Sequence, residues 1–125
     1  MPAFTELESA VLKAICDHLE DFGDHLRVVL ATAQVAERDN TGHGFYTRFS
    51  VDQKPPLPAL SGRLLDGPVA HMDDMGEDMQ MGFILWFEDG YPDCLEGFQY
   101  GDSKGETVDL KLRDLRELTF ASLAW

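Results

Sequence analysis

The sequence predicts an α+β fold in which an N-terminal helical hairpin packs on one antiparallel sheet of about five strands. Two observations lead to this prediction: apolar residues recur at steps of three and four up to Ala33, and from Gln34 onward they alternate. A chain of 125 residues with 44% hydrophobic and 26% charged residues fits one globular domain, 1–125. A sheet of about five strands would be of the usual size.

The first predicted helix has one apolar face, formed by Phe4, Leu7, Val11, Ile15, Leu19 and Phe22. Thr5 and Glu8 have the spacing of a capping box, and Gly23 is expected to end the helix. Asp24 can then cap a second, shorter helix. Its apolar side would carry Leu26, Val29, Leu30 and Ala33.

The first predicted hairpin joins "QVAERD" and "GFYTRFSV" around Asn40-Thr41-Gly42, because apolar and polar residues alternate in the second segment. The stretch "DQKPPLPALSGRLLDG" follows. Its closely spaced prolines exclude regular structure and predict a surface loop. A short strand is expected from Val69 to Asp73.

The second hairpin, "MQMGFILWFEDGYPDCLEGFQY", is the strongest signal in the chain. Asp89-Gly90 suits a type I′ turn, and Met79, Met81, Phe83, Leu85 and Phe87 would form one apolar stripe. After it, Val108, Leu110 and Leu112 alternate as a last strand. "RDLREL" could equally be a helical turn, so the structure of 113–125 stays open.

A two-residue turn at Asp89-Gly90 fixes a register in which Phe83 opposes Glu96 and Gly82 opposes Gly97. Glu96 would then lie on an apolar stripe with Phe83, Phe98 and Tyr100. Such a carboxylate needs a partner, Arg48 or a hydroxyl, or else its pKa rises. A structural ion pair, or an acid at a strand edge that reaches water, is the plainer alternative to a ligand anchor or general acid.

The two opposed glycines would leave a notch beside Trp86, where a flat ligand, another backbone or the protein's own helix can approach. The candidate binding residues are therefore Gly82, Trp86, Glu96, Gly97 and Tyr100. No residue is predicted to be catalytic, because the serine-hydrolase, zinc-protease and nucleotide-binding motifs are all missing.

The segment "HMDDMGEDMQM", 71–81, combines methionines and acids as a metal-binding loop would. Two of its methionines belong to the apolar stripe and are expected in the core. Counted from Asp73 or Asp74, its acids do not follow the spacing of a calcium loop. A solvated acidic turn is the preferred interpretation, with no metal and no cofactor.

Charge limits the partners. Asp and Glu number 23 against 10 Lys and Arg, and the net charge of −13 disfavours nucleic acid and membrane surfaces. A basic protein remains a suitable partner. The acidic N-terminus does not resemble a signal peptide, and two cysteines are too few for a disulfide scaffold, so a cytoplasmic location is expected.

The segments "TGHGFYTRFSVD" and "MGFILWFEDGYPDCLEGFQYGD" resemble a family of small bacterial proteins of unknown function. The shared pattern is G-x-G-F in the first hairpin and a G-F-x-L-x-x-x-D-G core followed by L-E-G-[FY]-x-Y in the second. The resemblance covers 41–52 and 81–102. It implies a compact α+β protein and no particular activity.

Two classes of function follow. The first is a non-catalytic binding protein, of the immunity or inhibitor type, that recognises a basic protein. The second is a small-molecule-binding protein or weak enzyme with its site around Glu96, Tyr100 and the Gly82/Gly97 notch. Because both sheet faces carry apolar residues, the face that the helices leave open could also meet a second copy of the chain.

Overall fold

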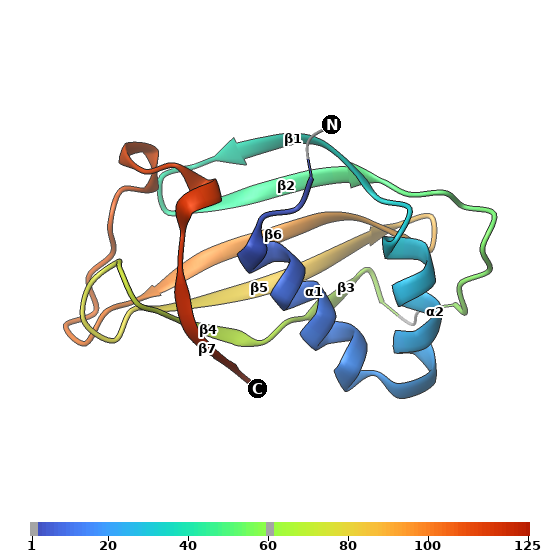
Figure 1. Cartoon of the computed structure of the whole chain (residues 1–125), viewed down its shortest axis with the longest axis horizontal. Coiled ribbons are helices and arrows are strands. Elements are labelled where there is room, and N and C mark those ends of the chain that lie inside the picture. Colours follow the sequence, from blue (N-terminus) through green and yellow to red (C-terminus); the bar gives the residue numbers. More distant parts are fainter. Residues whose placement is uncertain (1–2, 60–61) are drawn as a thin grey trace.

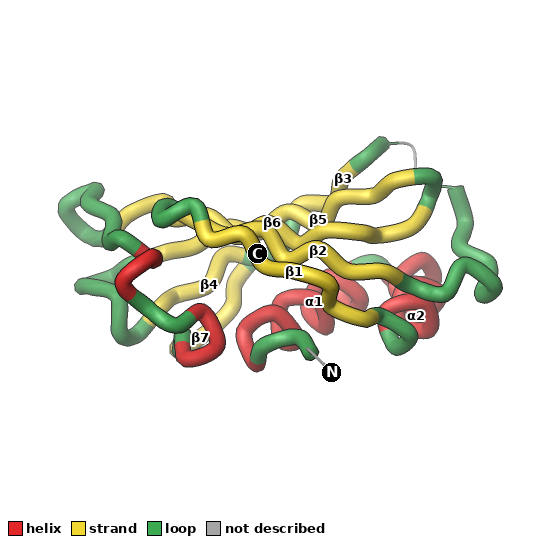
Figure 2. The backbone as a smooth tube through the Cα atoms, turned by 90° about the horizontal axis from the view of Figure 1, so that it is seen from above, coloured by secondary structure: helices red, strands yellow, loops and turns green. Residues whose placement is uncertain are grey.

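A computed structural model describes residues 3–59 and 62–125. Two helices lie on one side of a seven-stranded antiparallel sheet, which confirms the predicted α+β class with more strands than expected (Figures 1 and 2). The strands follow the order β1-β2-β6-β5-β4-β7, with β3 also paired to β5. They are β1 (Gln34–Asn40), β2 (Gly44–Ser50), β3 (Leu64–Asp66), β4 (Val69–Met72), β5 (Gln80–Glu88), β6 (Tyr91–Gly101) and β7 (Phe120–Ala124).

Helix α1 (Glu6–His18) begins with the predicted capping box of Thr5 and Glu8. The expected stop at Gly23 is wrong, because α2 (Glu20–Leu30) runs through it. A Cβ on Gly23 would lie 1.8 Å from the carbonyl oxygen of Cys16, so the glycine is needed where the two helices approach closely. The sequence pattern could not separate this packing role from a helix stop.

The second hairpin has the predicted turn, with positive φ at both Asp89 and Gly90. The predicted register is wrong by one residue beyond that turn. A bulge between Trp86 and Phe87 adds one residue to the β6 side, so Glu96 opposes Ile84 and not Phe83. Tyr91 and Pro92 keep their predicted partners, Glu88 and Phe87, whereas the partners of β6 residues from Cys94 onward are shifted by one, which exchanges the faces on which they meet.

The helix-covered face of the sheet carries the core. The predicted stripe of Met79, Met81, Phe83, Leu85 and Phe87 is fully buried there, together with Leu95 from β6 and with Phe45 and Phe49 from β2. Helix side chains such as Leu7, Val11 and Ile15 pack against it. Figure 2 shows both helices on this side. This arrangement settles which face the helices cover.

A buried polar network lies between α1 and the sheet. Glu8 is only 1% exposed, and its carboxylate pairs with Arg38 at 2.7 Å and accepts a hydrogen bond from the Thr47 hydroxyl. The same carboxylate also accepts from the Thr5 backbone N–H at 2.7 Å. One side chain therefore caps α1 and ties it to β1 and β2.

The segment 71–81 contributes more to the core than predicted. All four of its methionines are buried, Met72 and Met75 as well as Met79 and Met81. Its acids lie in the turn between β4 and β5, where Asp74 pairs with Arg113 at 3.7 Å and Asp73 accepts from the Thr119 hydroxyl. The segment is a packed connection with an acidic rim.

The C-terminal part differs from its prediction. Val108 to Leu112 is not a strand, because Leu110–Leu112 and Leu115–Glu117 form short 3-10 turns and the last strand is β7. β3 was predicted as part of a loop, and residues 60–61 of that loop lie outside the described residues. Neither α1 nor α2 is long and apolar enough to cross a bilayer.

Candidate functional site

The face of the sheet opposite the helices, here called the open face, contains the candidate site. Strand pairing arranges its side chains in rows that cross several strands. The first row is Glu37, Arg48, Cys94, Trp86 and Leu64, taken from β1, β2, β6, β5 and β3 in turn. The second row, in the same order of strands, is Asp39, Tyr46, Glu96, Ile84 and Asp66.

Glu96 is at the centre of the second row and is half-buried. The indole N–H of Trp86 donates a hydrogen bond of 2.9 Å to its Oε1 atom. Its negative charge, together with burial and a hydrogen bond, raises the pKa of Tyr46. Within 3–59 and 62–125, no basic side chain forms an ion pair with Glu96. The neutral Trp86 indole thus holds the carboxylate in place.

Arg48, the partner expected from the sequence, is engaged elsewhere. Its Nε lies 3.5 Å from Glu37, and its guanidinium lies 5.9 Å from the centre of the Tyr46 ring. The second expectation, a hydroxyl, agrees with the influence of Glu96 on Tyr46. The Trp86 indole was not foreseen as a donor, because the predicted register did not place Trp86 on the same face as Glu96.

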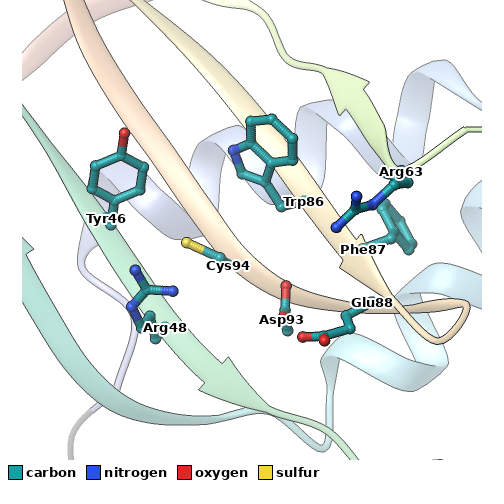
Figure 3. Close-up of a pocket in the computed structure, with 8 residues that line it drawn as sticks. All are labelled: Tyr46, Arg48, Arg63, Trp86, Phe87, Glu88, Asp93 and Cys94. Carbon is teal, nitrogen blue, oxygen red and sulfur yellow. The ribbon is translucent and has the colours of Figure 1, made fainter.

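A shallow hollow of about 210 Å³ adjoins this arrangement on the open face (Figure 3). It is lined by Tyr46, Arg48, Arg63, Trp86, Phe87, Glu88, Asp93 and Cys94. Sites for drug-sized ligands usually occupy about 300–1,000 Å³. The hollow is therefore better matched to a single side chain than to a cofactor-sized molecule.

Two carboxylates meet at one end of the hollow, where Figure 3 shows Asp93 and Glu88 close together. Asp93 is the extra residue of the bulge, since Cys94 pairs with Trp86 and Pro92 with Phe87. Burial and the neighbouring Glu88 raise the pKa of Asp93. The bulge explains why Asp93 and Cys94 line one hollow, although consecutive strand residues would normally face apart.

Cys94 does not have the surroundings of a reactive thiol. Burial raises its pKa to about 11, which outweighs the opposing effect of Arg48. The thiol therefore stays protonated at neutral pH and is a poor nucleophile. In the described part of the chain, no three His, Cys, Asp or Glu side chains gather as metal ligands would.

The other predicted site residues are separated. Gly97 lies on the core face, where an added Cβ would come within 2.8 Å of the Phe45 ring. Gly82 lies on the open face, beneath the rings of Phe98 and Tyr100. The predicted notch is therefore wrong, because aromatic rings already cover each glycine. Within the predicted set, Trp86 donates a hydrogen bond to Glu96, and the Tyr100 ring lies over Gly82.

Sequence reasoning missed Tyr46, Arg63 and Glu88. Tyr46 could have been found from its alternation with Phe45 and Thr47, since a strand with one core face presents the intervening residue to the other face. Arg63 had no comparable signal, because it lies in a stretch that was predicted to be irregular.

Comparisons with protein-family models, curated proteins and solved structures found no match. The resemblance of the two hairpin segments to a family of small bacterial proteins therefore stays a prediction.

Proposed function

We propose that this chain is a non-catalytic binding protein that recognises a basic protein partner through its open face, in the manner of an immunity or inhibitor protein. The observation that carries the proposal is the charge of that face. Its acids are Glu37, Asp39, Asp66, Glu88, Asp93 and Glu96, and its bases are Arg48 and Arg63. An excess of acids favours a basic surface by electrostatic complementarity.

The composition of the open face also supports recognition. Its acids surround half-buried aromatic residues, Tyr46, Trp86 and Phe98. Tyr and Trp are enriched in protein interfaces and among the few residues that dominate the binding energy. Two copies of this face would bring acids against acids, so the proposal is a different, basic chain and not a homodimer through this surface.

The alternative, a small-molecule site or weak enzyme, has less support. Its predicted notch is filled by aromatic rings, and the hollow beside Trp86 is small. The net charge of −13 disfavours nucleic acid and membranes as partners. We place the protein in the cytoplasm, where a reducing environment suits the free thiols of Cys16 and Cys94.

Quantitative capture from the native cell lysate with three forms of the chain tests this proposal. The open-face variant, Glu37→Gln/Asp39→Asn/Asp66→Asn, should lose a basic protein that the wild type retains. The helix-side variant, Glu6→Gln/Asp21→Asn/Asp24→Asn, removes the same number of exposed charges and should retain it. Equal loss from both variants, or capture of basic proteins without preference, would reject the proposal.

A further inference from the structure

We propose that Glu96, Tyr46 and Trp86 form a receptor for one arginine side chain of the partner. This inference rests on the proposed function and specifies how the open face would select its partner. We call these three residues the arginine receptor. All three lie on adjacent strands of the open face, β2, β6 and β5, and Figure 3 shows the Tyr46 and Trp86 rings on either side of the hollow.

The Glu96 carboxylate is held in a fixed orientation and can still bind a cation. Its Oε1 atom is oriented by the Trp86 indole N–H at 2.9 Å, so the side chain is held in place before any ligand arrives. It is half-buried but makes no ion pair in the described part of the chain. A carboxylate accepts up to about four hydrogen bonds, so one indole donor leaves capacity for an incoming cation.

Two aromatic rings lie beside the Glu96 carboxylate. Tyr46 lies directly across from Glu96 on β2, and Trp86 lies one row away on β5. Faces of Trp and Tyr rings attract cations within about 6 Å of the ring centre. Tyr46 already does so for the chain's own Arg48, at 5.9 Å. This contact shows that the Tyr46 ring attracts a guanidinium, here that of the chain's own Arg48.

The chemistry of this site favours an arginine side chain over a lysine side chain. A guanidinium is planar, stacks on aromatic rings and donates two parallel hydrogen bonds to a carboxylate, whereas an ammonium is a compact and strongly hydrated charge. The shallow hollow of about 210 Å³ is lined by Tyr46 and Trp86, and Glu96 adjoins it through its hydrogen bond to Trp86. A volume of this size has room for one guanidinium. Arg48 and Arg63 oppose a further cation, but Glu37, Glu88 and Asp93 lie beside them and offset their charge.

The test uses N-acetyl-arginine methylamide as the probe, with the lysine and citrulline analogues as comparisons. Citrulline keeps the shape of arginine without its charge. The chain has two tryptophans, so the Trp125→Phe background leaves the Trp86 indole as the single reporter, by its ¹H–¹⁵N NMR signal and its fluorescence. We expect the arginine probe to shift the Trp86 signal at millimolar concentration, with a weaker effect from lysine and none from citrulline.

Glu96→Gln should reduce the affinity for the arginine probe by about tenfold or more, as expected for the loss of a charge-assisted hydrogen bond. Asp66→Asn is the matched control, since it removes one charge from the same row without touching the rings. Tyr46→Leu should weaken binding a few-fold. If the amide NMR spectrum shows that Glu96→Gln disturbs folding, Tyr46→Leu tests the arginine receptor in its place.

Three results would overturn the inference: no response to the arginine probe, equal responses to arginine and lysine, or equal losses from Glu96→Gln and Asp66→Asn. Binding of the partner to the variants separates a failure of the arginine receptor from a failure of the proposed function. A partner that binds Glu96→Gln normally but is lost by the open-face variant would reject the arginine receptor and retain the recognition surface. A partner retained by the open-face variant would reject both.

Discussion

At the scale of single residues, Gly82 and Gly97 form a natural comparison. Both lie in the central hairpin, yet they face opposite sides of the sheet. A Cβ on Gly97 would lie 2.8 Å from the ring of Phe45 and 3.0 Å from that of Phe83, both fully buried. A Cβ on Gly82 would lie 2.6 Å from the ring of Phe98 and 2.8 Å from that of Tyr100, which is 59% exposed.

We therefore expect Gly97→Ala to lower the free energy of unfolding by about 1–3 kcal/mol, because the buried rings have no space into which to move. Gly82→Ala should cost less, since its covering rings can turn toward solvent. Urea denaturation of both variants measures the difference. A Gly82→Ala variant as unstable as Gly97→Ala would mean that the open face is packed as rigidly as the core.

Glu8 provides the second residue-scale prediction. It is buried with Arg38, and removal of one partner leaves the other charge uncompensated. Glu8→Gln should lower the free energy of unfolding by about 3 kcal/mol. Lys13→Gln is the control, because it breaks an exposed ion pair with Asp17 and should change the stability far less. Equal midpoints in urea would contradict a structural role for the buried pair.

At the scale of elements, the sequence predicted the strands of the central hairpin but not their alignment. Alternation and the Asp89-Gly90 turn were sufficient for the strands and their turn type. The bulge between Trp86 and Phe87 depends on how tertiary packing accommodates one extra residue, Asp93, and it has no local signature. Glu96 was thus recognised as a notable acid, but the register assigned it to the wrong face.

The same limit explains the other corrections. Gly23 has the sequence pattern of a helix stop, and only the approach of α1 reveals its packing role. Val108 to Leu112 alternates as a strand would, yet Gln99 binds the backbone of Val108 through both groups of its side-chain amide. Contacts between neighbouring elements decided both cases, and the hydrophobic pattern within one element does not contain them.

Asp93, the extra residue of the bulge, should make the stability of the fold depend on pH. Burial and Glu88 raise the pKa of Asp93 above its ordinary value of 3.8. Ionised Asp93 therefore opposes folding at neutral pH, and this effect disappears as the pH falls below 3.8. Asp93→Asn should raise the melting temperature at pH 7 and lose that advantage below pH 3.8.

Glu88→Gln should give part of the same gain, because it removes the neighbouring charge while Asp93 remains. Differential scanning calorimetry from pH 3 to pH 8 follows both variants. An Asp93→Asn variant that melts below the wild type at pH 7 would show that the ionised carboxylate stabilises the bulge.

At the scale of the whole molecule, a strongly acidic chain leaves one face of its sheet uncovered by helices. All 23 acids and 10 basic residues are carried by a 14.0 kDa chain, and the helices cover only one face of its sheet. Acidic surfaces also keep many proteins dispersed, so net charge alone does not imply a partner. The distribution of charge is more informative, because the open face carries six acids and two arginines around half-buried aromatic residues.

The most direct test of the recognition surface is the association rate constant between this chain and the captured basic protein, measured by stopped flow from 0.01 to 0.15 M salt. The Debye length falls from about 30 Å to about 8 Å over this range. The open-face and helix-side variants each remove three negative charges from −13 and carry −10, so they differ only in where charge is lost. We predict that the wild type and the helix-side variant associate much faster at low salt, whereas the open-face variant loses most of that acceleration. Equal salt dependence in the two variants would contradict recognition through the open face.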